Sequence, residues 1–176
     1  MKKASLELGI NFIVVMIISV ILLGVGFFLV SKGATAWQKE YDKMKAYHES
    51  QIKSSMARDG RMVLVYPNTI TTSQGEEEIF TLGINNELGQ DEEFSIVVEP
   101  SATAKHPENK VLYVKDPLFI KNTQSGFTPI VITPAKGTPG KQTYIFNVCV
   151  FVGKTVGRCS SEDAYGDLQK ITVNVK

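Results

Sequence analysis

The sequence contains few of the residues, and none of the longer motifs, on which most enzyme active sites depend. Only two histidines, His48 and His106, occur among 176 residues, and they lie in different regions of the chain. No His-Glu-x-x-His, no phosphate-binding loop and no Gly-x-Ser-x-Gly is present. These absences predict a protein that is not an enzyme, with no catalytic residues and no cofactor.

The charges are balanced, which gives no electrostatic basis for nucleic-acid binding. The 19 Lys and Arg residues oppose 18 Asp and Glu residues, for a net charge of +1. Two acidic clusters, residues 76–78 and 91–93, could meet at one end of the folded domain, where calcium would need oxygen ligands from several such groups. Because no loop with a defined ligand spacing is present, the sequence favours a solvated acidic edge and predicts no metal site.

Cysteine is also scarce, and both cysteines lie in the carboxyl-terminal half of the chain. Cys149 and Cys159 would pair outside the cytoplasm and stay thiols inside it, and their spacing does not match a zinc site. We expect a disulfide that closes the connection over residues 152–167 and stabilises the domain by about 2–3 kcal/mol. A free buried thiol at Cys149 is the alternative.

In contrast to these absences, the sequence has a long uncharged apolar run from Leu8 to Val30, whose only polar side chains are those of Asn11 and Ser19. A bilayer core about 30 Å thick requires roughly 20 apolar residues, whereas a signal-peptide core has about 7–15. The run therefore predicts a retained transmembrane helix over residues 8–30, with a lipid bilayer as its partner. The short basic segment 1–7 favours a cytoplasmic amino terminus and an extracytoplasmic carboxyl-terminal domain.

The first seven residues, Met-Lys-Lys-Ala-Ser-Leu-Glu, followed by the apolar run, resemble the class III signal of archaeal type IV pilin-like proteins and archaellins. In that family a peptidase cuts on the cytoplasmic side of the apolar segment, which implies a cut between Ala4 and Ser5. The resemblance also implies that Glu7 pairs with the amino terminus of a neighbouring subunit and that Asn11 takes part in helix pairing. Alternatively, the two lysines are flanking charges and Glu7 caps the first helical turn.

Residues 31–60 are predicted to form a helical stalk, with a break at residues 31–33. The segment is rich in good helix formers and carries a weak apolar stripe with helical spacing. Trp37 and Tyr41 lie where aromatic side chains anchor a helix at the membrane interface. Packing on neighbouring subunits or on the chain's own domain would explain the stripe, but its narrowness slightly favours a solvated stalk. The stripe consists of Trp37, Tyr41, Met44, His48, Ile52 and Met56.

From residue 61 the apolar periodicity changes from helical to alternating, which predicts a mainly β domain over residues 61–176. The pattern indicates an antiparallel, roughly seven-stranded β-sandwich, in which Pro129 marks a strand edge or a bulge. Two stretches, Glu77–Glu87 and Thr133–Val148, resemble immunoglobulin-like surface modules of bacteria and archaea, which implies that fold. The predicted strands cover residues 62–66, 78–85, 94–98, 111–115, 127–132, 143–152 and 168–175.

These features together predict a membrane-anchored, extracytoplasmic, pilin-like protein that acts in cell-surface filament or envelope assembly. Its expected partners are the lipid bilayer and further copies or other envelope subunits, and its expected location is the plasma membrane or a surface filament. The alternative is a non-assembling, signal-anchored binding module for a carbohydrate, solute or protein. An exposed aromatic platform would support that alternative, and its candidate residues are Tyr66, Tyr113, Phe119, Phe127 and Tyr165.

Overall fold

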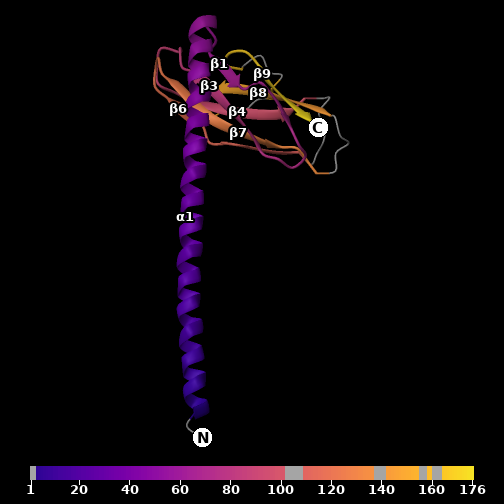
Figure 1. Cartoon of the computed structure of the whole chain (residues 1–176). Coiled ribbons are helices and arrows are strands. Elements are labelled where there is room, and N and C mark those ends of the chain that lie inside the picture. The colour runs from indigo at the N-terminus through magenta and orange to yellow at the C-terminus, as the bar shows by residue number, and fades with distance from the viewer. Residues whose placement is uncertain (1–2, 102–108, 137–141, 155–157, 160–163) are drawn as a thin grey trace. The chain divides into compact units, whose positions relative to one another are not determined.

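The computed structural model describes the backbone of residues 3–101, 109–136, 142–154, 158–159 and 164–176 (Figure 1). Side chains are described for the same residues except 3–11, 29–31 and 33–37, which lie within the helix. The chain divides into two compact units, Met1–Met44 and Lys45–Lys176. From Lys3 onward the amino-terminal unit is helical, whereas the second unit contains the last turns of the helix and every strand that the structure describes.

A single helix, α1 (Lys3–Asp59), runs through residues 31–33, so the predicted break there is wrong. Good helix formers flank Gly33, and one glycine weakens a helix by only about 1 kcal/mol relative to alanine. The helix ends where Gly60 adopts a φ of 64° and donates its N–H to the carbonyl of Met56 at 2.9 Å. Among the residues whose side chains are described, no helix is both long enough and apolar enough to cross a membrane.

The second unit is a β-sandwich of two sheets, as the alternating pattern predicts. Sheet A has the strand order β1-β3-β7-β5 and sheet B has the order β2-β9-β8-β4-β6. Every neighbouring pair is antiparallel except β2 with β9, which is parallel. The strands are β1 (Val63–Tyr66), β2 (Thr69–Thr72), β3 (Glu78–Asn85), β4 (Glu92–Pro100), β5 (Lys110–Tyr113), β6 (Leu118–Ile120), β7 (Ser125–Thr133), β8 (Thr143–Val152) and β9 (Gln169–Val175).

All seven predicted strands overlap an observed strand, but β2 and β6 were not predicted. Strand β2 reads Thr-Ile-Thr-Thr, which has one large apolar residue, and it forms because it can pair with β9 at the far end of the chain. Strand β6 has three residues directly after Pro117 and pairs only with the start of β4. Both strands depend on distant partners, which local periodicity does not reveal.

The core lies between the two sheets and is filled by alternate side chains of the central strands. Phe80 and Leu82 of β3 belong to the same core cluster as Phe94 of β4 and Phe146 of β8, and each is at most 1% exposed. Burying a large apolar side chain contributes about 1.5–3 kcal/mol relative to leaving it exposed. The sheet order and this shared core make the domain an immunoglobulin-like β-sandwich.

Pro129 lies inside β7, a strand that pairs with β3 on one side and β5 on the other. A proline inside a sheet would ordinarily remove a hydrogen bond from the ladder. Strand β5 pairs only with residues Ile130 to Thr133 of β7. At Pro129, therefore, no described strand lies on the β5 side of β7. The position is locally an edge, as predicted from the proline.

Candidate functional site

The last turns of α1 pack on the outer face of sheet A, within the second unit. His48, Ile52 and Met56 are 8%, 0% and 6% exposed, and they recur every four residues on one side of the helix. Opposite them, β3 presents Thr81 and Gly83, which are buried as well. The predicted solvated stalk is therefore wrong from Lys45 onward. The small outward side chains of β3 leave room for the helix, so the weak stripe is enough to hold it.

The helix approaches the sheet closely at Gly83. A Cβ added to Gly83 would lie 2.4 Å from Cγ2 of Ile52 and 3.1 Å from a ring carbon of Phe127. Any larger residue at this position would push the helix away from β3. Lys53 also lies over the Phe127 ring, with its Nζ 5.2 Å from the ring centroid.

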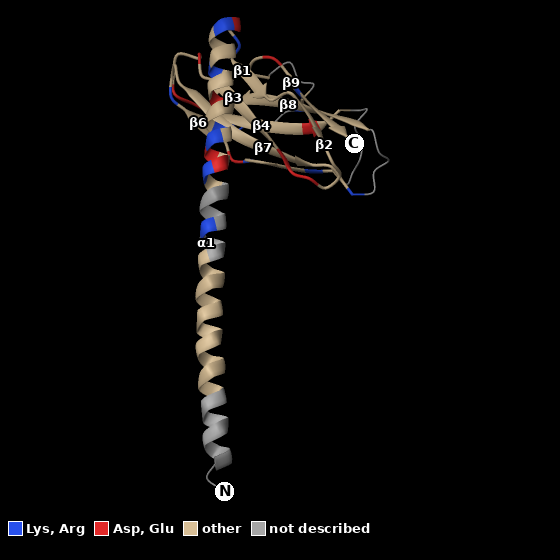
Figure 2. Ribbon diagram, viewed as in Figure 1, with Lys and Arg blue, Asp and Glu red and all other residues tan. Residues whose placement is uncertain are grey.

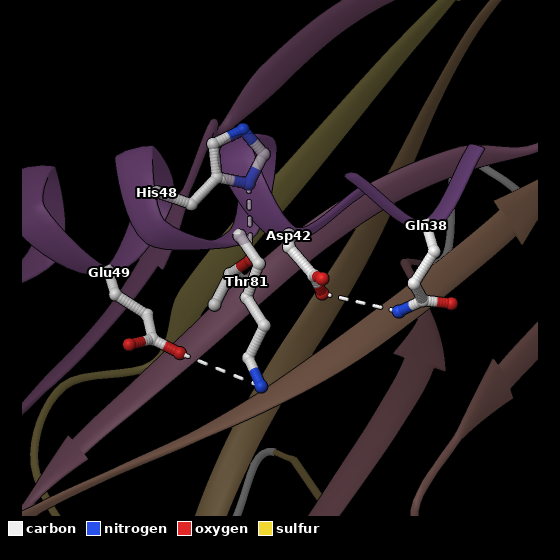
Figure 3. A network of polar contacts seen from close by, with 6 residues as sticks. Gln38, Asp42, His48, Glu49 and Thr81 are labelled. Carbon is white, nitrogen blue, oxygen red and sulfur yellow. Dashed lines mark hydrogen bonds and ion pairs between the residues drawn. The ribbon is translucent and has the colours of Figure 1, made fainter. Parts of the chain in front are cut away.

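Polar contacts accompany this apolar packing (Figure 3). Nδ1 of His48 lies 3.1 Å from Oγ1 of Thr81. The His48 ring also lies 5.3 Å from the Tyr66 ring in an edge-to-face arrangement, which the figure does not draw. Lys45 and Glu49 form an ion pair of 3.9 Å on the same part of the helix. Burial lowers the pKa of His48, because the charged imidazolium would lose its hydration at this contact.

The lowered pKa of His48 predicts a domain that is less stable in mild acid. Between the lowered pKa of the folded state and the ordinary unfolded value of about 6.5, the unfolded state binds more protons than the folded state. The stabilising contribution of neutral His48 is therefore present above that value and lost as the pH falls. Urea unfolding at about pH 7 and about pH 5 should show a larger loss for the wild type than for His48→Gln. Equal losses in the two proteins would contradict the assignment.

Several predicted site residues lie outside the part of the chain whose side chains are described. The backbones of Ala4, Ser5, Glu7, Asn11 and Trp37 are in α1, but their side chains are not described. Leader cleavage and helix pairing therefore stay predictions. Tyr41, the second predicted interface anchor, is half-buried in the first unit, and its contact with a membrane also stays a prediction.

The structure brings Cys149 and Cys159 together on the outer face of sheet B, as two buried free thiols. Sγ of Cys149 donates to the carbonyl of Cys159 at 3.2 Å, and Sγ of Cys159 lies 3.5 Å from the carbonyl of Val97. Burial raises the pKa of both thiols, which disfavours the reactive thiolate. The structure thus contains free thiols, as in the alternative to the disulfide. A disulfide in oxidising surroundings stays a prediction.

The two acidic clusters lie at opposite ends of β3, so the expectation that they could meet is wrong. Glu78 begins that strand, whereas Asp91 lies beside the turn that follows its end and accepts the N–H of Asn122 at 2.9 Å. Glu76 accepts the N–H of Ser73 at 3.1 Å, and this hydrogen bond lowers its pKa. No group of His, Cys, Asp and Glu in the described part of the chain could hold a metal ion.

A buried polar cluster at the β3–β4 turn was not singled out from the sequence. Asn86 is fully buried and donates to the carbonyls of Gln90 and Ile120. The hydroxyl of Tyr165 donates to the carbonyl of Asn85 at 2.7 Å and so ties a distant segment to this turn. In the sequence this site is marked only by the consecutive asparagines Asn85 and Asn86, which do not reveal partners this far along the chain.

The candidate aromatic residues do not form an exposed platform in the part of the chain that the structure describes. Phe119 is 58% exposed, whereas Tyr165 is 8% exposed and forms part of the core. Tyr66, Tyr113 and Phe127 are half-buried, and Phe127 lies beneath Lys53. This arrangement gives no support to a carbohydrate-binding surface built on these rings.

No protein-family model and no curated protein matches this sequence. Among solved structures, the chain is similar to a family 123 glycoside hydrolase from Clostridium perfringens, with a TM-score of 0.45 and 10% identity over 62% of this chain and 23% of that one. It is similar to a PapD-like domain of human CEP192, with a TM-score of 0.42 and 13% identity over 66% of this chain and 86% of that one. It is also similar to the E. coli chaperone DraB, with a TM-score of 0.39 and 15% identity over 66% of this chain and 55% of that one. Likenesses this distant carry no argument about function, and the sheet order itself identifies the fold.

Proposed function

We propose that this chain is a non-enzymatic, membrane-anchored structural or interaction protein that displays its sandwich outside the plasma membrane. The observation that carries the proposal is the exposed apolar stretch of α1. From Phe12 to Phe28 every large apolar side chain is between 47% and 78% exposed, and no charged residue occurs in this stretch (Figure 2). A helix that is apolar on all sides belongs inside protein or lipid.

A lipid bilayer would cover all sides of this helix at once. The consecutive residues Ile21, Leu22 and Leu23 are 58%, 66% and 74% exposed, and successive residues point about 100° apart around a helix. A single docked protein surface would cover only one side. The hydroxyl of Ser19 donates to the carbonyl of Val15 at 2.8 Å, so this polar group is satisfied within the helix. The sequence also continues without charge from Leu8 to Val30, which is long enough for a bilayer core of about 30 Å.

The sandwich would then be the displayed part, and its contacts would be with proteins. The described residues offer neither a metal-binding group nor an exposed aromatic platform. Contact with envelope or filament subunits, in a pilin-like arrangement with a cytoplasmic amino terminus, is therefore the role that fits best. Filament and anchor versions differ in whether the apolar helix leaves the bilayer.

The proposal is tested by floating the full chain with lipid vesicles. Purified protein is incorporated into phosphatidylcholine vesicles by detergent removal and centrifuged through a density gradient containing carbonate. The wild type should float, whereas Ile18→Lys with Leu22→Lys should stay at the bottom, because each lysine at the centre of a membrane helix costs about 2.5–3.5 kcal/mol.

The matched control places two lysines at exposed apolar positions of the sandwich. Leu88 and Phe119 are 41% and 58% exposed, so Leu88→Lys with Phe119→Lys should float like the wild type. The proposal fails if the wild type stays at the bottom, or if both double variants float equally well.

A further inference from the structure

We propose that β5 pairs with β5 of a second copy of this chain, which would join two A sheets edge to edge. β5 is the last strand of sheet A and pairs with β7 on one side. No described strand lies on its other side, so among the described residues the outward N–H and C=O groups of β5 have no strand partner. The proposal does not rest on the membrane anchor, because it uses residues of the sandwich alone.

The outer face of sheet A carries an apolar row beside this edge. The strand register aligns Ile79 of β3 with Val131 of β7, and Val131 with Leu112 of β5. Ile79 and Val131 are half-buried, Leu112 is 51% exposed, and Val114 just after the strand is 44% exposed. Helix α1 covers the same face at Gly83. The row is thus a part of this face that the helix leaves open.

The other three edge strands are less suited to pairing. β1 is followed directly by Pro67, and β6 has three residues and is preceded by Pro117, so each lies next to a residue without an N–H donor. β2 reads Thr-Ile-Thr-Thr and carries little apolar surface. β5 reads Lys-Val-Leu-Tyr, contains no proline, and has Lys110 as its single charge.

A second copy of the chain fits this edge because the edge is complementary to itself. In antiparallel pairing about a two-fold axis at Leu112, this residue faces Leu112 of the partner subunit. Lys110 then faces Val114 of the partner subunit, so no two like charges are opposed. The apolar row of one copy continues into the row of the other across the junction. Such a contact uses the same patch twice and closes at a dimer.

Site-specific cross-linking of the full chain in detergent micelles tests this contact. Opposed residues of paired antiparallel strands have Cα atoms about 4.5–5.5 Å apart, which a disulfide can bridge. Under mild oxidation Leu112→Cys should form a reducible dimer roughly tenfold more readily than Leu88→Cys. Leu88 is a fair control because it is also exposed, at 41%, but lies on the β3–β4 turn. Cys149 and Cys159 are 1% and 4% exposed and should give little background.

Three further variants check the register and the independence of the contact. Mixing Lys110→Cys protein with Val114→Cys protein should give a mixed dimer, whereas Val114→Cys alone should cross-link much less than Leu112→Cys. Leu112→Cys should still cross-link when Ile18→Lys and Leu22→Lys remove association through the apolar helix. The proposal is overturned if Leu112→Cys cross-links no better than Leu88→Cys, if Val114→Cys alone cross-links as well, or if the two lysines abolish the dimer.

Discussion

Replacing Ile52 with alanine is expected to lower the free energy of unfolding by about 2–5 kcal/mol, which makes it one of the most damaging single changes in this chain. Ile52 is fully buried between α1 and sheet A, and its Cγ2 reaches the backbone of β3 at Gly83. Truncation would leave a cavity that the helix can close only by shifting. Urea unfolding of the full chain, followed by circular dichroism, measures the loss. Ser54→Ala, at an exposed position of the same helix, should change the free energy by less than about 0.5 kcal/mol.

Gly83→Ala is the companion variant that identifies the cause of this loss. Alone it should destabilise the domain, because the new Cβ would lie 2.4 Å from Cγ2 of Ile52. In the Ile52→Ala background that methyl group is absent, so Gly83→Ala should be less harmful there. The expected coupling between the two sites is about 0.5–3 kcal/mol. Strictly additive effects, or an Ile52→Ala variant as stable as Ser54→Ala, would show that the helix does not depend on this contact.

The sandwich could be predicted from the sequence because each core strand carries its own alternating apolar pattern. In β8, alternate residues from Tyr144 to Val150 are buried in the core, and the alternation is visible without knowing any partner strand. The two short strands β2 and β6 could not be predicted in this way. Their residues become strands only because β9 and β4 lie beside them, and such long-range pairing leaves no periodic signal.

The contact between the helix and the sheet shows where the sequence was ambiguous. The stripe containing His48 and Ile52 was visible, but it is equally typical of a solvated stalk and of a packed helix. What decides between them is the outer face of β3, where Thr81 and Gly83 are small enough for a helix to approach. The small size of these two residues indicates a helix contact only when the helix is already known to lie on this face. The sequence alone does not show this, so the solvated-stalk interpretation failed.

The cysteines and the acidic clusters show the limits of reasoning from spacing. The short separation of Cys149 and Cys159 was enough to predict that they meet, but spacing does not determine whether they are oxidised. Residues 76–78 and 91–93 are also close in sequence. They are held apart because β3 runs between them as an extended strand.

Replacing Asn86 with alanine is also expected to destabilise the domain strongly, by about 2–5 kcal/mol. Its Nδ2 donates to the carbonyls of Gln90 at 2.8 Å and Ile120 at 2.9 Å, and its Oδ1 accepts the N–H of Leu88 at 3.1 Å. Asn86 is fully buried, so water cannot readily replace the lost amide. Each partner left unsatisfied costs about 1–3 kcal/mol. Thermal and urea unfolding of the full chain would measure the loss.

Two further substitutions separate hydrogen bonding from packing at this turn. Asn86→Asp keeps the shape of the side chain, but the carboxylate cannot donate and would face two carbonyl oxygens, so it should destabilise at least as much as alanine. Asn174→Ala is the matched control, because Asn174 is only half-buried and accepts one hydrogen bond, from the Thr143 hydroxyl at 2.7 Å. It should cost less than about 1 kcal/mol. If Asn86→Ala were no worse than Asn174→Ala, or if Asn86→Asp were as stable as the wild type, the buried amide would not be what holds this turn to β6.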